Sequence, residues 1–385
     1  MKSKWKSETI GNLVRVASGQ VDPKDEQAKH MLVVGPENLF TGGGLDKKNL
    51  HSAEELGMIS GKYAFDDQAI LYSKIRPNLN KVCLPDFQGL CSADMYPLWV
   101  RDKTTAHRVY MYYLLTSERF VSDASSRSFR TGLPKINRPD LESITVEIPP
   151  LGEQRKIAAI LRAWDEAIEN LTRLRELREK QYLGLRNYLI DWSKNQHAVK
   201  QFLKPTPRPV PKPTLGYRAL SIRSHGKGTF DRFVENPESV EMETLYVAKA
   251  GDIIVNITFA WEGAVALVPL GHDGCLVSHR FPTFVPKLER VDARYLRHAL
   301  RMARFTYLLG IASPGGAGRN RVLSKSEFLD LMVPLPPLDL QRRVATILDD
   351  AEKAIAAEEN YLSALNRQKR GLMQKLLTGE WRVKC

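Results

Sequence analysis

Four short segments contain residue types that can carry out chemistry, and each lacks a part that the chemistry requires. Gly226-Lys227-Gly228-Thr229 resembles a phosphate-binding P-loop, but the leading glycine of the GxxxxGK[ST] motif is missing. The glycine clusters 42–44 and 315–318 do not form a GxGxxG motif between a strand and a helix, so they are interpreted as loops. Segment 139–143, PDLES, has the proline and the acids of a nuclease PD…ExK motif without its lysine. These segments therefore predict no phosphoryl-transfer, dinucleotide or nuclease site.

Methyl transfer and metal chemistry are not predicted either. The N/D-P-P-Y/F/W loop with which adenine methyltransferases hold a flipped base is absent from the sequence. Cys83, Cys91, Cys275 and Cys385 form no CxxC pair, and no histidine cluster accompanies them at zinc-ligand spacing. We interpret them as free thiols in a reducing cytoplasm. We therefore assign no catalytic residue and no metal ligand to this chain.

The charge of the chain favours a polyanionic partner. Its 57 Lys and Arg residues exceed its 44 Asp and Glu residues, for a net charge of +13, and such an excess displaces counterions from phosphates. Many basic proteins bind no nucleic acid, so the charge alone leaves the partner open. No signal peptide and no run of about 18 apolar residues is found. We therefore expect a cytoplasmic protein without contact to a membrane.

Residues 148–190 and 335–377 are two copies of one segment, which align without a gap. An internal repeat of this length indicates duplication. The identical pairs are Pro149/Pro336, Pro150/Pro337, Leu151/Leu338, Gln154/Gln341, Arg155/Arg342, Ala158/Ala345, Ile160/Ile347, Leu161/Leu348, Ala167/Ala354 and Ile168/Ile355.

Each copy predicts a long helix that begins after a Pro-Pro pair. About forty residues without proline follow, with one glycine in each copy. In the second copy, apolar residues recur at alternating steps of three and four, as in a coiled coil, and the series is broken only at Glu358 and Lys369. The series includes Val344, Leu348, Ile355, Leu362, Leu365 and Leu372.

The first copy starts with the same pattern and then departs from it. Its apolar series is Ile157, Leu161, Trp164, Ile168 and Leu171. Arg175 and Arg178 stand at the next two positions, so we expect the stripe to shift to Leu174 and Leu177. Ordinary amphipathic helices that pack on their own domains are the alternative. Because a small domain cannot cover a helix of roughly 60 Å, we expect the two stripes to be buried against each other.

The segments before the helices predict two compact α/β or α+β units, because short apolar runs alternate with Gly, Pro, Asn and Asp. Three pairs of segments are weakly similar between the halves: 69–73 with 252–256, 91–97 with 277–282, and 133–148 with 320–335. We therefore expect the duplication to cover the whole chain. The proline-dense segment 205–213, PTPRPVPKP, is interpreted as a stiff linker rather than a ligand for a proline-recognition domain.

This layout resembles the specificity subunits of type I restriction–modification systems. The resemblance rests on PPLGEQRKIAAIL with PPLDLQRRVATIL, on LMQKLLTGEWRV (372–383), and on DIIVNITFAWEGA…GCLVSHRFPTF (252–284), and it covers essentially the full length. It implies an α+β fold with two target-recognition domains, joined by two long helices that form an antiparallel coiled coil with pseudo-twofold symmetry. The expected domains are 1–147 and 196–334, with helical regions 148–195 and 335–385.

The resemblance also implies partners and a division of labour. Each domain would read one half of a bipartite site in double-stranded DNA, and the coil would set the spacer. Two methyltransferase subunits would dock on the chain, and endonuclease and translocase subunits would join them. No cofactor is expected in this chain, because S-adenosylmethionine would bind the methyltransferase. The alternatives are a protein-interaction scaffold with non-specific DNA affinity and a nuclease or methyltransferase in its own right, which the missing catalytic loops disfavour.

If the chain reads DNA, candidate contact residues can be chosen by side-chain type. Base edges and phosphates are bound by Arg, Lys, Asn, His and small polar residues in loops. The candidates in the first half are Lys74, Arg76, Asn78, Arg127 and Arg130. Those in the second half are Lys227, Asn256, His279, Arg280, Arg319, Asn320 and Arg321. Arg280 has an alternative role in an ion pair with Glu262, and Trp261 is interpreted as a core residue rather than a stacking platform.

Overall fold

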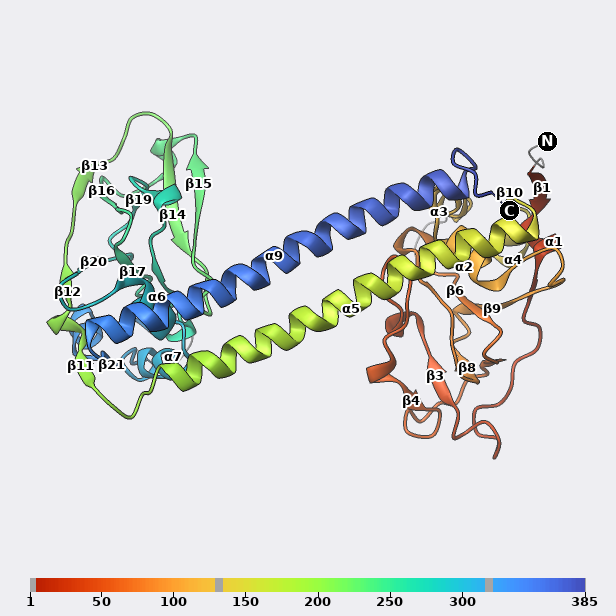
Figure 1. Ribbon diagram of the computed structural model, residues 1–385, viewed down its shortest axis with the longest axis horizontal. Helices are drawn as coiled ribbons and strands as arrows, with labels where there is room; N and C mark the ends of the chain where they lie inside the picture. Colours follow the sequence, from red (N-terminus) through yellow and green to blue (C-terminus); the bar gives the residue numbers. More distant parts are fainter. Residues whose placement is uncertain (1–4, 129–133, 316–320, 385) are drawn as a thin grey trace. The chain divides into compact units, whose positions relative to one another are not determined.

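The computed structural model describes residues 5–128, 134–315 and 321–384. The chain divides into two units: unit 1 contains residues 1–172 and 361–385, and unit 2 contains residues 173–360. Two long helices, α5 (Leu151–Leu189) and α9 (Leu338–Leu377), each contribute one part to each unit (Figure 1). The two helices predicted after the Pro-Pro pairs are thus confirmed.

Unit 1 contains two four-stranded sheets and one two-stranded sheet. Their strand orders are β2-β9-β6-β7, β4-β3-β8-β5 and β1-β10. The strands are β1 (Lys6–Thr9), β2 (Val14–Val16), β3 (Leu32–Val34), β4 (His51–Ser52), β5 (Tyr63–Phe65), β6 (Ile70–Ser73), β7 (Val82–Cys83), β8 (Gly89–Cys91), β9 (Met95–Val100) and β10 (Thr145–Ile148). The short helices are α1 (Ile10–Leu13), α2 (Arg108–Thr116), α3 (Glu118–Ser126) and α4 (Arg138–Glu142).

Unit 2 contains sheets of four, five and two strands. Their orders are β12-β20-β17-β18, β13-β16-β19-β14-β15 and β11-β21. The strands are β11 (Gln196–Ala198), β12 (Leu203–Pro205), β13 (Pro209–Pro211), β14 (Tyr217–Ile222), β15 (Thr229–Val234), β16 (Thr244–Val247), β17 (Ile253–Val255), β18 (Val265–Leu267), β19 (Leu276–Val277), β20 (Thr283–Pro286) and β21 (Met332–Pro334). The short helices are α6 (Ala293–Leu300), α7 (Ala303–Ile311) and α8 (Lys325–Asp330).

The two units share one topology, so the predicted duplication of the whole chain is confirmed. The order β2-β9-β6-β7 corresponds to β12-β20-β17-β18. In the other large sheet, β3 pairs with β8 in parallel, as β14 does with β19, and each of these pairs is flanked by antiparallel neighbours. Unit 2 adds β13 at one edge of that sheet.

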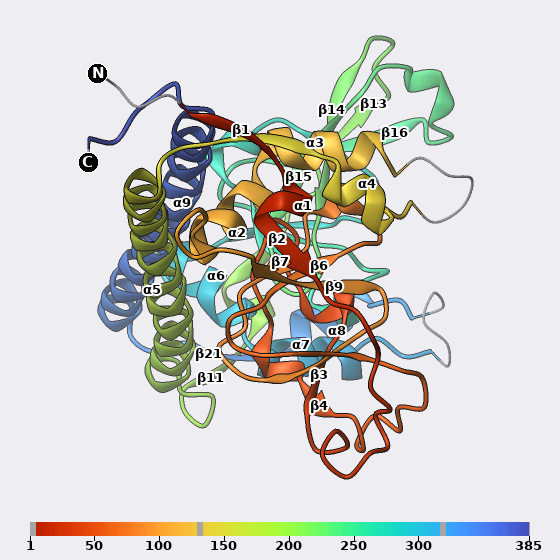
Figure 2. The same ribbon diagram turned by 90° about the vertical axis from the view of Figure 1, so that its right-hand side faces the viewer.

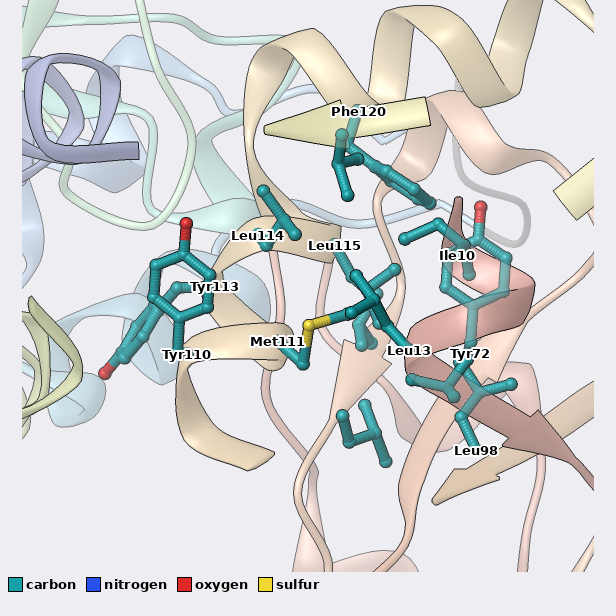
Figure 3. Close-up of a cluster of buried hydrophobic side chains, with 14 of the residues drawn as sticks. Ile10, Leu13, Tyr72, Leu98, Tyr110, Met111, Tyr113, Leu114, Leu115 and Phe120 are labelled. Atoms are coloured by element: carbon teal, nitrogen blue, oxygen red, sulfur yellow. The ribbon is translucent and has the colours of Figure 1, made fainter. Parts of the chain in front are cut away.

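The core of unit 1 is built from its helices and from the sheet β2-β9-β6-β7. Ile10 and Leu13 of α1 pack with Tyr110 and Met111 of α2 and with Phe120 of α3 (Figure 3). Burial of these side chains follows from the hydrophobic effect, at about 1.5–3 kcal/mol for each large side chain. In unit 2, the corresponding cluster contains side chains of α6, α7, β17 and β20.

A buried glutamine explains the repeated PPLxxQ segment in unit 1. The side chain of Gln154 is fully buried one turn into α5. Its Oε1 accepts from the backbone N–H of His107 at 2.9 Å, and its Nε2 donates to the carbonyls of Thr105 and Pro149, both at 2.9 Å. One side chain thus satisfies backbone groups at the start of α2 and at the start of α5, which would otherwise be buried without partners.

Gln341 repeats this arrangement in unit 2. It is also fully buried. Its Oε1 accepts from the N–H of Asp292 at 2.9 Å, and its Nε2 donates to the carbonyls of Arg290 and Pro336 at 3.1 and 2.7 Å. The two glutamines therefore join the start of each long helix to the start of α2 or α6.

The long helices contact each other antiparallel within each unit, because residues later in α5 pair with residues earlier in α9 (Figures 1 and 2). In unit 1, Lys369 of α9 pairs with Asp165 of α5. The side chains of Ile157, Leu161 and Leu362 are buried, and those of Trp164, Ile168, Leu171, Leu365 and Leu372 are half-buried. Lys369, one of the two breaks in the predicted apolar series, thus has a carboxylate partner on the other helix.

In unit 2, the predicted shift of the α5 stripe is wrong. Leu174 and Leu177 are 43% and 54% exposed. Arg178 pairs with Glu358 of α9 at 2.8 Å, and Arg175 pairs with Glu359. The arginines keep the original helix face because their partners on α9 are acidic. Of the interruptions in the two apolar series, Arg178 and Glu358 pair with each other, and Arg175 pairs with the neighbouring Glu359. Nearer the start of α9, Val344 and Leu348 are buried and Ile355 is half-buried.

The proline-dense segment is extended, as predicted, but it is not a linker. It contributes β12 and β13, which pair with β20 and β16 in two different sheets. Between these strands, Arg208 forms ion-paired hydrogen bonds of 2.5 and 3.1 Å with the buried carboxylate of Asp252. Both strands lie at sheet edges, where proline is tolerated because its missing N–H costs no ladder bond.

Candidate nucleic-acid interface

Three segments of unit 1 meet where β6 ends, and one of them carries the candidates Lys74 and Arg76. The N–H of Lys74 donates to the carbonyl of Asp94 at 3.0 Å, and the N–H of Ile136 donates to the carbonyl of Lys74 at 2.9 Å. Next to them, the N–H of Arg76 donates to the carbonyl of Pro134 at 2.7 Å. These bonds join the segments 74–76, 92–95 and 134–136 into one place, which we call the unit 1 junction.

Unit 2 has the same junction where β17 ends. The N–H of Ile257 donates to the carbonyl of Arg280 at 3.0 Å, and the N–H of Leu323 donates to the carbonyl of Ile257 at 2.9 Å. The segments 256–258, 278–281 and 321–323 thus form the unit 2 junction. The sequence placed candidates on each of these segments but did not predict that backbone bonds join them, because no local pattern signals pairing between distant loops.

The unit 1 junction presents cationic side chains beside an aromatic ring. The ammonium of Lys74 lies 5.2 Å from the ring centroid of Tyr96, within the range of a cation–π contact. Burial and the neighbouring Lys135 lower the pKa of Lys74. Arg76 and Asn78 are exposed, and Arg76 has a left-handed backbone with φ of 48°. The candidates Lys74, Arg76 and Asn78 therefore lie together.

Lys135 is a residue that the sequence analysis missed. Its side chain is exposed at the unit 1 junction, and its ammonium lies 3.6 Å from a carboxylate oxygen of Asp94. Lys135 directly precedes Ile136, which bonds to Lys74. The local signal was its position within segment 133–148, whose weak similarity to segment 320–335 does not distinguish Lys135 from other surface lysines.

The serine-rich segment of unit 1 provides one described arginine. Arg127 follows α3, is exposed, and donates from Nη1 to the hydroxyl of Ser143 at 2.9 Å. Arg130 lies outside the described residues. Most of the nearby PDLES segment lies in α4. Asn137 caps this helix by accepting from the N–H of Asp140, and Glu142 pairs with Arg138 in the same helix.

In unit 2, two of the candidates maintain the local structure. The Oδ1 of Asn256 accepts from the N–H and the hydroxyl of Thr258 at 3.1 and 2.8 Å, which holds the turn after β17. Arg321 donates to the carbonyls of Gly310 and Ser313, and its guanidinium lies 5.3 Å from the ring centroid of Trp261. Both side chains are bound within the unit, so they shape the junction.

The other candidates of unit 2 are exposed. His279 and Arg280 lie in the loop between β19 and β20, and Lys227 lies in the turn between β14 and β15. The carboxylate of Glu262 accepts from the hydroxyl of Ser224 at 2.5 Å, and no Glu262–Arg280 ion pair occurs among the residues that the structure describes. Arg319 and Asn320 lie outside those residues.

One cluster of side chains could offer metal ligands by distance. Ligand atoms of His298, Asp349 and Glu352 lie within 4.8 Å of one another. The carboxylates are already bound by guanidinium groups, however, with Arg297 2.7 Å from Asp349 and Arg301 2.5 Å from Glu352. Two positive groups in place of an ion make this cluster an ion-pair network. In the described ranges, no helix is long and apolar enough to cross a membrane.

Comparison with known proteins identifies the family. The family model described as "Type I restriction modification DNA specificity domain" matches residues 2–179 and 231–367, which is most of the chain. The chain therefore belongs to this family and is a DNA specificity subunit of a type I restriction–modification system. Specificity subunits are the non-catalytic component of these complexes, and the methyltransferase partner uses S-adenosylmethionine.

Two relatives show how similarity is distributed along the chain. The specificity subunit of type I restriction enzyme EcoDI from Escherichia coli is 46% identical over 103 residues, which are 27% of this chain and 22% of that protein. The specificity subunit of type I restriction enzyme MjaVIII from Methanocaldococcus jannaschii is 23% identical over 332 residues, 77% of this chain and 75% of that protein. High local similarity thus coexists with low similarity along most of the length.

A solved structure supports the fold. The S subunit of the type I restriction–modification system from M. genitalium matches with a TM-score of 0.56 at 16% identity, over 97% of this chain and 96% of that chain. This likeness covers both globular units and both long helices.

Proposed function

We propose that each unit reads one half of a bipartite, asymmetric DNA site and that the paired helices set the spacer between the halves. The observation that carries this proposal is the junction, which occurs at the same place of the same topology in both units but presents different side chains. One chain that binds two half-sites gains affinity through effective concentration.

Within this proposal, the exposed candidates contact DNA and the bound ones hold the loops. Arg76, Asn78, Arg127, His279 and Arg280 are exposed, as base or phosphate contacts require. Asn256 and Arg321 position the unit 2 junction through the bonds described above. Lys74, Lys227, Arg130, Arg319 and Asn320 complete the proposed set.

The proposed partners are two methyltransferase subunits, which endonuclease and translocase subunits join in the cytoplasm. The exposed apolar side chains on the helix segments of unit 2 support a protein docking surface, since exposed apolar groups often mark interfaces. These side chains are Leu174, Leu177, Leu183, Tyr188, Leu340 and Ile347. We propose domain limits of 1–147 and 196–334 for the readers and 148–195 and 335–385 for the helical regions.

Methylation mapping tests the proposed function directly. The chain is co-expressed with the methyltransferase encoded beside it, and methylated adenines are mapped across the genome. One bipartite motif with a fixed spacer is the expected result. Sequence-blind DNA binding without any methylated motif would instead favour the scaffold.

A helix deletion tests the role of the coil. Removing four residues from α5 or α9 shortens that helix by about 6 Å. The accepted spacer should change while both half-sites keep their sequences. A deletion that altered the half-sites and kept the spacer would contradict this role.

Alanine variants test the readers. Arg280→Ala, Arg130→Ala or Arg319→Ala should cost about 1–3 kcal/mol of specific binding wherever the side chain contacts a base edge. Binding is measured on the mapped site and on random DNA. Equal losses on both would mark a phosphate contact.

A further inference from the structure

A small cavity in unit 2 lies between the β14–β15 turn, the edge strand β18 and the end of α6. Its volume is about 160 Å³. The lining residues are Gly226, Lys227, Gly228, Val265, Ala266, Leu267, Arg297, Leu300 and Arg301. We call it the hairpin pocket; the hairpin can be followed in Figure 1. Three cationic side chains and no acidic one line it, so its lining favours an anion.

Two of these cations are held in place by acids behind them. Nη2 of Arg297 lies 2.7 Å from Asp349 and 2.6 Å from Glu352, and Nη1 of Arg301 lies 2.5 Å from Glu352. Arginine has five N–H donors. Among the described residues, the recorded contacts of Arg297 and Arg301 use one nitrogen of each guanidinium, so donors of both forks remain for a ligand.

The turn that closes the pocket is built for close approach. His225, Gly226 and Gly228 have positive φ values of 61°, 65° and 81°. A Cβ atom on Gly226 would lie 3.0 Å from Cγ of Arg301, so glycine allows the backbone to lie against this arginine. Lys227, between the two glycines, is exposed and can turn toward a ligand at the pocket mouth.

Unit 1 has no arginine at the two helix positions that supply Arg297 and Arg301 to the pocket of unit 2. Because α2 and α6 start one residue after the N–H groups bound by Gln154 and Gln341, Arg297 corresponds to Tyr112 and Arg301 to Thr116. The glycine loop of unit 1 also approaches this helix, since a Cβ on Gly43 would lie 2.6 Å from the hydroxyl of Tyr112. The loop-against-helix arrangement is thus common to both units. The cavity beside this loop in unit 1 has other cations in its lining, Arg119, Lys369 and Arg370, but also the acids Glu118, Asp123, Glu147 and Asp165, so the lining without an acid is that of unit 2.

We propose that the hairpin pocket binds a phosphate group, and that the source is a backbone phosphodiester of the DNA held by unit 2. This rests on the proposed function, which it deepens by adding a sequence-independent contact. Side chains anchored by acids and backed by a glycine turn suit a small tetrahedral anion rather than a flat base edge. The pocket therefore holds the register of unit 2 on the duplex, while the junction reads bases.

The test compares charge-neutral variants within the full complex of this chain and its methyltransferase. Lys227→Gln and Arg301→Gln each remove one positive charge from the pocket, and the amide introduced by Arg301→Gln keeps a donor for Glu352. Lys103→Gln is the matched control, because Lys103 is exposed in the turn between β9 and α2, outside both the pocket lining and the proposed docking surface. Thermal unfolding of each complex establishes that the variants are folded.

Affinity for the mapped site and for random duplex is measured over a range of salt concentrations. Each pocket variant should weaken both by the same factor, roughly three- to tenfold, and should lower the slope of log K against log salt by about 1. Lys103→Gln should change neither, and the methylated motif should stay the same. A loss confined to the mapped site, or no loss on either duplex, overturns the proposal.

Titration with inorganic phosphate distinguishes the two sources of the anion. Competition between phosphate and random duplex, lost in Lys227→Gln, supports the phosphodiester. Phosphate binding that depends on Lys227 and leaves DNA affinity untouched assigns the pocket to a free phosphate and overturns the DNA contact. Failure of the proposed function would look different, because the unchanged complex would then bind no sequence preferentially.

Discussion

In both units, three side chains join the two long helices to a short helix, but the side-chain types differ between the units. In unit 1, the hydroxyl of Tyr113 donates to Asp165 at 2.5 Å, and Lys369 pairs with the same carboxylate. At the corresponding positions of unit 2, His298 contacts Tyr182, whose hydroxyl donates to Glu352 at 2.7 Å. In both units the carboxylate belongs to the long helix that begins in that unit. The group on the short helix is Tyr113 in unit 1 and His298 in unit 2, and the group on the other long helix is Lys369 in unit 1 and Tyr182 in unit 2.

The two buried glutamines, in contrast, are identical in both units, because their partners are backbone atoms. Gln154 and Gln341 bind the same three kinds of backbone group in both units. A side chain that serves the backbone is constrained by the fold, whereas partners that are side chains can change together. In a duplicated domain, contacts between side chains can therefore diverge, while side chains that bind the backbone stay the same.

The largest expected effect comes from the glutamines. Gln154→Ala and Gln341→Ala should each lower the free energy of unfolding by about 2–4 kcal/mol, because backbone groups lose their partners and a cavity remains. Scanning calorimetry measures both. The exposed Gln368 provides a control, since Gln368→Ala should have little effect. Unequal losses for the two buried glutamines would break the equivalence of the units.

Charge reversal tests the ion pair that interrupts the stripes in unit 2. Glu358, whose side chain is 13% exposed, faces Arg178. Glu358→Lys should destabilise the chain by about 1–2 kcal/mol through like-charge contact and desolvation. Adding Arg178→Glu should restore much of the loss in denaturant unfolding. Additive effects of the two changes would show that the pair is not coupled.

A pH difference should distinguish His298 from Tyr113. Burial and then Arg297 lower the pKa of His298, against the opposing effect of Asp349 and Glu352. The unfolded chain therefore binds the proton more tightly, so this contribution is present above about pH 6.5 and is lost as the pH falls through the lowered pKa. Tyr182 of α5, Arg297 of α6, and Asp349 and Glu352 of α9 face the ring.

His298→Gln measures this contribution. Between pH 7.5 and 5.0, the variant should lose less stability than the unchanged chain, by about 1.4 kcal/mol for each unit by which the pKa is lowered, up to the width of that window. Glu352 does not interfere, since its folded pKa of about 2 lies below the window. Identical pH profiles would contradict the prediction.

The smallest effect is expected on the exposed face of α5. Leu177→Ala should change the free energy of unfolding by less than about 0.5 kcal/mol, because this side chain is 54% exposed. Leu161→Ala, at a fully buried position, should cost about 2–5 kcal/mol. A large loss for Leu177→Ala would instead support the predicted shift of the apolar stripe of α5 to Leu174 and Leu177.

The sequence predicted the long helices and the duplication because both leave local or periodic signals. It failed at Arg175 and Arg178, since an interruption in one stripe is meaningful only beside Glu358 and Glu359 of the other. It also failed at segment 205–213, where edge strands tolerate proline. The junctions join loops far apart in sequence, so candidate residues could be named by type but not grouped.

The division of the long helices between the units has a consequence for synthesis. Leu376 and Leu377, near the end of α9, belong to the buried cluster of unit 1 with Ile10 and Ile157. On a ribosome, the first unit to emerge therefore waits for this part of α9, which is synthesised after unit 2, before its core is complete. Unit 2, whose residues 173–360 are contiguous, has its full core earlier, so the order of emergence and the order of completion are reversed.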